Sequence, residues 1–208
     1  MLDLLEAPLQ TLASHVGAGA WAMAAFFCGF PLAVLAVRHK VRGLLAMPLW
    51  IHRLGKKYLT RQLSPAFLFA FIFLFNTIAI FVYMVSGGLV ILPVVCAVFT
   101  GLNVCVITLV AARESAEQEP RPNSPPARAW VGFLSLFSMA IELPVFWLAV
   151  GMGIKLGRAM EAEFTWAAFV AAAEPRVIAY VLMLVPALAL AALAEAISVT
   201  AMIRAERQ

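Results

Sequence analysis

Residues 66–111 read AFLFAFIFLFNTIAIFVYMV (66–85), SGG (86–88) and LVILPVVCAVFTGLNVCVITLVA (89–111), without a single acidic or basic side chain. A helix crosses the hydrocarbon core of a bilayer with about 20 apolar residues. The first and third segments are long enough to do so, and the Ser-Gly-Gly between them is a turn signal. The stretch therefore predicts a helical hairpin that spans the membrane twice.

Outward from this hairpin, three further apolar segments have the length of a span: residues 19–37, 129–154 and 177–203. The composition agrees, because the chain is 64% hydrophobic and 12% charged, whereas soluble domains carry about 25% charge. We predict an all-α, polytopic integral membrane bundle of about five transmembrane helices. Residues 1–208 would form a single membrane domain with almost no soluble part.

The segment 41–63 has a different pattern. Its apolar residues recur at helical spacing, and seven of the 15 Lys and Arg residues of the chain lie in or next to it. This pattern predicts an amphipathic helix in the membrane interface, bent near Pro48, although an ordinary basic loop would share the composition. We expect it to bind anionic lipid head groups rather than nucleic acid. The basic residues are Arg38, Lys40, Arg42, Arg53, Lys56, Lys57 and Arg61.

The distribution of positive charge predicts an orientation. If the basic segment is cytoplasmic, five spans place the linker 113–128 and the C-terminus on the same side, together with twelve of the fifteen Lys and Arg residues. Positive charge collects on the cytoplasmic side of membrane proteins. We therefore expect the N-terminus outside and the C-terminus inside. If the first segment does not cross fully, the N-terminus would lie inside instead.

Two carboxylates lie within apolar segments. Glu142 is near the middle of the fourth predicted span, and Glu195 lies on the fifth. A carboxylate in the bilayer costs a few kcal/mol, so each should face a partner or a cavity, or carry a proton. One interpretation is an ion, proton or substrate pathway, and the other is a structural carboxyl that joins neighbouring helices.

Other small polar residues accompany these carboxylates in the predicted spans. They could be part of the same site, or they could join helices by hydrogen bonds that are usually worth under about 2 kcal/mol. The candidates are Ser135, Ser138, Asn76, Thr100 and Asn103. Four glycines are candidates for close helix packing: the pair Gly153 and Gly157 at small-xxx-small spacing, and the turn pair Gly87 and Gly88.

No familiar catalytic or metal-binding set appears in the sequence. The three histidines, His15, His39 and His52, lie outside the predicted spans, and the three cysteines lack CxxC spacing. There is no phosphate-binding loop, so ATP hydrolysis would require another chain. We expect no catalytic residue, no metal and no cofactor.

The fourth span contains residues that resemble a known family. Ile141-Glu142-Leu143-Pro144, followed by Gly151, Gly153 and Leu156-Gly157, is similar to the H-G-x-x-E-L-P-A…A-G…G-x-x-L-G stretch of the stage II sporulation protein M family. The resemblance extends over about residues 64–200 and includes Ala-Ala-Leu-Ala-Glu-Ala at 191–196. Ser138-Met139 stands where the family has His-Gly, so a role for a His–Glu pair does not carry over.

This resemblance implies a five- or six-helix protein of a bacterial or archaeal plasma membrane. The namesake of the family is a membrane scaffold for a peptidoglycan-degrading complex. We therefore expect a non-catalytic scaffold or assembly subunit that acts as a homo-oligomer or with other membrane subunits. The alternative is a permease or transporter subunit that uses the intramembrane carboxylates and could act as a homodimer with a separate ATPase.

Overall fold

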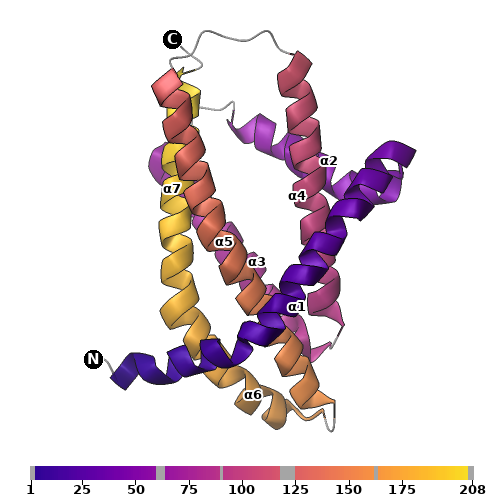
Figure 1. Cartoon of the computed structure of the whole chain (residues 1–208). Coiled ribbons are helices and arrows are strands. Elements are labelled where there is room, and N and C mark those ends of the chain that lie inside the picture. The colour runs from indigo at the N-terminus through magenta and orange to yellow at the C-terminus, as the bar shows by residue number, and fades with distance from the viewer. Residues whose placement is uncertain (1–2, 60–63, 90, 118–124, 162–163, 206–208) are drawn as a thin grey trace.

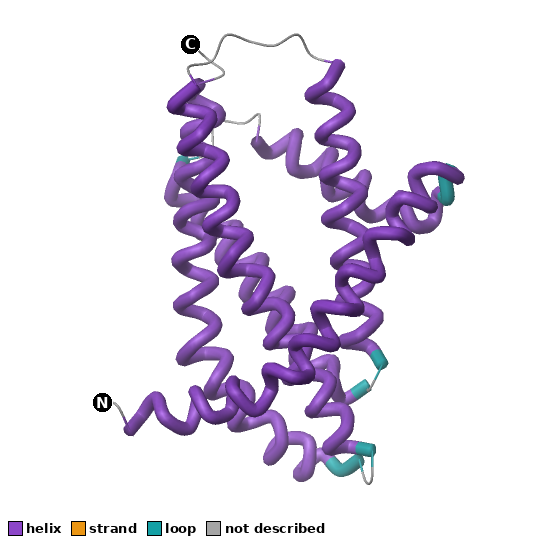
Figure 2. The backbone as a smooth tube through the Cα atoms, in the orientation of Figure 1, coloured by secondary structure: helices purple, strands orange, loops and turns teal. Residues whose placement is uncertain are grey.

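The computed structural model describes residues 3–59, 64–89, 91–117, 125–161 and 164–205, and these are almost entirely helical (Figures 1 and 2). The prediction of an all-α bundle is confirmed, since the described residues contain no strand. The elements in chain order are α1 (Asp3–His39), α2 (Arg42–Leu59), α3 (Pro65–Val85), the 3-10 turn η1 (Ser86–Gly88), α4 (Leu92–Glu117), α5 (Pro125–Met160), α6 (Trp166–Ala179), the π-helical turn η2 (Tyr180–Leu184) and α7 (Val185–Ala205).

Five helical segments are long and apolar enough to cross a membrane, in agreement with the predicted number. They comprise α1, α3 with η1, α4, α5 and the continuous stretch from α6 to α7. The helices exceed the predicted spans at several ends, since α5 continues to Met160 and α4 continues to Glu117. Hydropathy locates apolar positions, whereas a helix continues beyond the apolar segment until its backbone is interrupted.

The first span is longer than the sequence pattern indicates. The predicted span 19–37 is only part of α1, a single helix of 37 residues that begins at Asp3. In Figure 1 its N-terminal part runs along the lower end of the bundle, where α1 contacts α5 and α6, before the helix rises toward α2. His15 was expected outside the spans, but it lies within this continuous helix and is 4% exposed.

The fifth span changes direction near its start. α6 lies across the lower end of the bundle and leads through η2 into α7, which rises to the upper end (Figure 1). Thr165 caps α6 by accepting a hydrogen bond from the backbone N–H of Ala168 at 3.2 Å. A π-helical turn inserts an extra residue into the helix, a common cause of a local bend. The exposed aromatic rings of Phe164 and Trp166 lie at this end, as expected for a membrane interface.

A short turn connects α3 and α4, but the two helices do not pack closely against each other. α4 packs mainly against α1, whereas α3 packs against α5 and α7, and the two helices make few contacts with one another. The prediction of a very short connection is confirmed by η1. Adjacency in sequence did not determine which helices pack together. The turn joins only the ends of α3 and α4, so the rest of each helix can pack against other helices.

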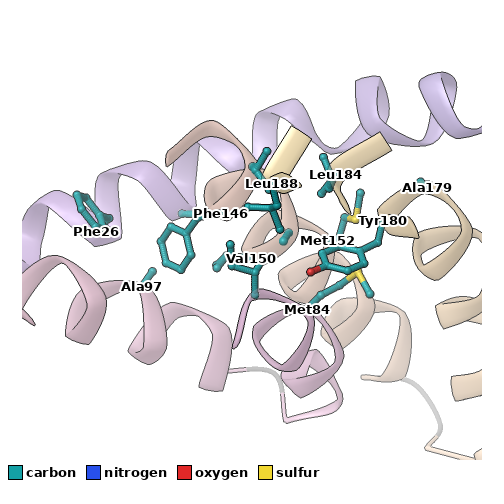
Figure 3. Packing of buried hydrophobic residues seen from close by; sticks show 14 residues of the cluster. Phe26, Met84, Ala97, Phe146, Val150, Met152, Ala179, Tyr180, Leu184 and Leu188 are labelled. Carbon is teal, nitrogen blue, oxygen red and sulfur yellow. The ribbon is translucent and has the colours of Figure 1, made fainter. Parts of the chain in front are cut away.

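The core lies where α1, α3, α5 and the α6–α7 stretch meet (Figure 3). Phe26 of α1 contacts Phe146 of α5 with ring centroids 6.0 Å apart. Tyr180 is 2% exposed and packs its ring against Phe81 of α3. Its hydroxyl donates to the Thr77 carbonyl oxygen at 2.6 Å. These contacts fix η2 against α3.

Glycines permit the closest crossings between helices. A Cβ at Gly29 or Gly101 would lie closer than 3.0 Å to backbone atoms of the facing helix, so α1 and α4 touch backbone to backbone. A Cβ at Gly151 of α5 would lie 2.6 Å from the Gly19 nitrogen of α1. Such small-residue contacts drive helix association in membranes, where apolar burial alone does not.

The predicted packing glycines take part in the same arrangement. A Cβ at Gly87 of η1 would overlap the Gly153 carbonyl of α5, so the turn between α3 and α4 rests directly on α5. Gly88 faces the Phe169 ring, with its nearest ring carbon 3.2 Å from a Cβ at that position. Gly157 is buried on α5. The close contacts of Gly87 with α5 and of Gly88 with Phe169 explain why glycines occupy both positions of the turn.

Candidate functional site

The polar residues of the membrane core gather where α3, α5 and α7 meet. Asn76 of α3 donates a hydrogen bond from Nδ2 to Oε1 of Glu142 on α5, at 2.9 Å. Both residues lie near the middle of their helices, and both side chains are half-buried. An amide donor to a carboxylate is a strong pairing in a medium of low dielectric constant. The predicted intramembrane carboxylate therefore has a specific partner on another helix.

The second carboxylate approaches the same point from α7. Glu195 lies close enough to Glu142 for the two carboxyl groups to interact electrostatically. Within the described part of the chain, Glu195 makes no hydrogen bond of its own. Two carboxylates that share a site of low dielectric constant repel each other strongly when both are ionised. The repulsion is relieved when one of the two carboxyl groups carries a proton.

Serines extend this cluster along the α5–α7 contact. Ser135 of α5 and Ser198 of α7 form a hydrogen bond between their hydroxyls at 3.1 Å, and Ser198 also donates to the Val131 carbonyl at 3.2 Å. Ser138 is 3% exposed and lies one turn before Glu142, close to its carboxyl, but its hydroxyl does not complete a hydrogen bond there. The sequence prediction that Ser135, Ser138 and Glu142 share one face of the helix agrees with this arrangement.

The polar candidates of α4 do not join this cluster through hydrogen bonds. Thr100 donates its hydroxyl to the Cys96 carbonyl of its own helix at 2.8 Å. The side-chain oxygen of Asn103 is buried and has no hydrogen-bond partner among the described residues. α4 packs mainly on α1, whereas the cluster lies between α3, α5 and α7. The sequence pattern could not show this, since it gave no information on which helices are neighbours.

The predicted interfacial helix is present as α2, and its face toward the bundle is now defined. Leu44, Leu45 and Leu49 pack against Leu102 and Val106 of α4. Pro48 lies within a continuous helix and is buried. The helix therefore has its own packing surface on the bundle, which an ordinary basic loop would lack.

An ion-pair network holds the C-terminal part of α2 to α4. Glu114 accepts from Lys56 Nζ at 2.6 Å and lies 3.2 Å from His52 Nε2. Exposed apolar residues, Met47 and Trp50, occupy a second face of the helix. Arg42 and Arg53, which are eleven residues apart and so lie on one side of the helix, are exposed and form its basic face. Arg38 and Lys40 are exposed just before α2, the side chain of Lys57 is not described, and Arg61 lies outside the described residues.

Sequence reasoning missed two residues of the polar core. Ser198 is buried on α7 and bonds to both the side chain and the backbone of α5. Tyr180 joins η2 to α3 through its hydroxyl. The spacing of Glu195 and Ser198 by three residues, one helical turn, was the available signal for Ser198. No local signal existed for Tyr180, because its partner is a backbone carbonyl distant in sequence.

The comparisons with known proteins agree with this architecture. No curated protein and no solved structure matches the chain. A family model, described as stage II sporulation protein M, matches residues 22–199. That range includes the polar cluster of α3, α5 and α7 and every glycine crossing except the contact at Gly19. With five helices that are able to span a membrane and a match over most of its length, the chain belongs to the stage II sporulation protein M family of membrane proteins.

Proposed function

We propose that this protein is a non-catalytic membrane scaffold, an assembly subunit that presents its helices to other membrane proteins. The observation that carries the proposal is the hydrogen bond between Asn76 and Glu142. It gives the central carboxylate a structural partner and ties α3 to α5. A cavity lined by α1, α4 and α5 does not include either residue.

The outer surface supports an assembly role. Large apolar side chains on one face of α3 are exposed along its length: Phe67, Phe71, Leu74, Phe75, Ile78 and Val82. Lipid covers such a face in a single subunit, and a partner helix covers it in a complex. We expect homo-oligomers or complexes with other membrane subunits to form through surfaces of this kind. Anionic lipid head groups would bind the exposed basic face of α2.

The orientation follows from charge together with the arrangement of the helices. α2, the C-terminal end of α4, the N-terminal end of α5 and the C-terminal end of α7 lie at the same end of the bundle (Figure 1). That end contains the basic segment. We propose that it faces the cytoplasm, with the N-terminus outside, in a bacterial or archaeal plasma membrane.

A specific observation favours a second candidate, a permease or transporter subunit. Glu142 and Glu195 interact electrostatically inside the membrane, and the buried hydroxyl of Ser138, one turn from Glu142, has no hydrogen-bond partner in the part of the chain that the structure describes. Paired carboxylates in membrane proteins commonly mark ion or proton pathways. In such a subunit the pair would take up and release a proton or cation, and a separate ATPase could drive the cycle.

The two candidates differ in what Glu142→Gln would do. Glutamine keeps the carbonyl oxygen that accepts from Asn76, but it removes the charge. A scaffold would keep its partners in blue-native electrophoresis and affinity purification from membranes. A transporter would lose ion- or proton-coupled flux in reconstituted vesicles.

Matched variants make the comparison clear. Asn76→Leu removes the donor and leaves the carboxylate, so it should weaken a scaffold's assembly more than Glu142→Gln does. Glu114→Gln, on the α2–α4 contact, controls for a general effect of losing a carboxylate. If Glu142→Gln releases the partners while Asn76→Leu retains them, the scaffold proposal fails.

A further inference from the structure

The molecule has a groove whose lining does not include Glu142 or Glu195. Its volume is about 600 Å³, and it is lined by one stripe of α1 together with Val94 of α4 and the last turns of α5. The α1 residues are Ser14, Gly17, Ala18, Trp21, Ala24, Ala25 and Cys28. At 1.5 Å per residue the stripe extends roughly 20 Å along the helix. That length exceeds half the thickness of the hydrocarbon core of a bilayer.

Small side chains on α1 create the groove. Gly17 has no atom within 4 Å of the position that a Cβ would occupy, so the space above it is open. Ala24 and Ala25 continue the same face, and Trp21 borders it with 72% of its surface exposed. The walls are therefore apolar and suit a hydrocarbon chain.

One end of the groove is positively charged. Lys155 and Arg158, on the last turns of α5, line it beside Ser14. Lys155 donates one hydrogen bond to the Ser14 carbonyl oxygen, which leaves its other two N–H donors available. Among the described residues, neither cation forms an ion pair.

Further positive charge lies behind this end. Arg176 of α6 and Lys155 both lie near the buried ring of His15. Arg176 donates to the Ala172 carbonyl of its own helix, and its Nε has no partner among the described residues. The acidic residues on these turns, Glu161 and Glu174, are exposed. No described carboxylate forms an ion pair with Lys155, Arg158 or Arg176, so an anionic group at the mouth of the groove would meet positive charge.

We propose that this groove binds one anionic phospholipid, with an acyl chain along α1 and the phosphate at Lys155 and Arg158. The cations lie within the last two turns of α5, which ends at Met160, where the interface of the membrane is expected. Basic pockets between transmembrane helices bind anionic lipid head groups in this manner. The site is separate from the basic face of α2, which lies at the opposite end of the bundle (Figure 1).

The experiment compares lipid retention by the full-length protein. The protein is purified from nanodiscs that contain equal amounts of phosphatidylglycerol and phosphatidylcholine, and native mass spectrometry counts the lipids that remain bound. Gly17→Leu and Ala24→Leu fill the groove. Lys155→Gln and Arg158→Gln remove the charges, and each should lower phosphatidylglycerol retention about fivefold.

Two controls separate this site from other effects. Gly132→Leu introduces the same side chain at another glycine with open space around it. Arg113→Gln removes a charge from an exposed position near the end of α4, outside the groove and outside α2. Both should leave retention at the groove unchanged, and each variant is first shown to unfold at the parental temperature.

Three outcomes would overturn the proposal. Unchanged retention in Gly17→Leu and Ala24→Leu would place the lipid elsewhere. Equal loss of phosphatidylcholine and phosphatidylglycerol in the Gln variants would show that the charges do not select the head group. Conversion of a dimer to a monomer by Gly17→Leu, without loss of lipid, would assign the groove to a second copy of the chain.

Discussion

Gly101 of α4 lies against the backbone of Phe26 of α1, and a Cβ at position 101 would stand closer than 3.0 Å to the Phe26 carbonyl oxygen. The Phe26 ring packs on Phe146 of α5. One residue of α1 therefore meets α4 through its backbone and α5 through its side chain. This double contact sets the position of α1 between the two helices.

Replacement of Gly101 by alanine should destabilise the bundle. The added methyl group meets backbone atoms rather than a flexible side chain, so α1 and α4 must separate. Overpacking of this kind costs about 1–3 kcal/mol. We expect a lower unfolding temperature in detergent or nanodiscs, measured by thermal aggregation or intrinsic fluorescence.

Gly132→Ala and Gly17→Ala serve as controls for this measurement, because neither position has an atom within 4 Å of the added Cβ. In a helix, alanine is also favoured over glycine. Both controls should match or exceed the stability of the parent. Equal loss of stability in Gly101→Ala and the controls would contradict the backbone contact.

The Asn76–Glu142 hydrogen bond should appear as a coupling between two positions. Asn76→Ala, Glu142→Ala and the double variant form a thermodynamic cycle. Hydrogen bonds between helices in membranes couple by about 0.6 kcal/mol on average, and this bond to a carboxylate should exceed that value. The free energy of unfolding in mixed micelles gives the measurement, and strictly additive effects would show that the two side chains do not interact.

The attachment of α2 to α4 should depend on Glu114. Glu114→Gln removes the carboxylate that Lys56 and His52 approach. We expect faster backbone hydrogen exchange in residues 42–59, with little change in α5, measured by mass spectrometry. The adjacent Arg113→Gln is the control, because Arg113 is exposed. Identical exchange in both variants would mean that the leucine contacts alone hold α2.

The proposed orientation predicts opposite labelling of two exposed positions. Gly43 lies in α2 with open space around it, and Glu161 follows the end of α5. In intact cells an impermeant maleimide should label Glu161→Cys but should reach Gly43→Cys only after the cells are permeabilised. The parent protein, with its natural cysteines, gives the background, and the reverse pattern would place the N-terminus inside.

Much of the architecture could be predicted from local sequence. The uninterrupted apolar segment 66–111 gave two spans and the short turn between them, because crossing a bilayer requires length and apolarity and little else. The amphipathic pattern of 41–63 likewise predicted α2, because helical periodicity places its apolar side chains on one side of the helix and its polar side chains on the other. The first span was predicted to begin at residue 19, whereas α1 begins at Asp3, because helix continuity does not depend on hydropathy.

The candidate site was predicted less completely. Glu142 and Asn76 were identified one by one, because polar groups in a bilayer are costly and therefore rare. Their pairing across α3 and α5 could not be read from spacing. The same holds for Thr100 and Asn103, which are equally polar but belong to a helix that packs against α1.

By itself, the sequence determined that this chain is a helical membrane protein, where its helices lie and which of its residues are out of place in lipid. These properties depend on the transfer of each segment from water to the bilayer, which is a sum over local residues. Only the tertiary structure decided that α1 crosses α4 and α5, that Asn76 meets Glu142 and that a cationic groove opens beside Gly17. Those features depend on which backbones can touch, and that is set by surfaces that meet only after the helices have packed.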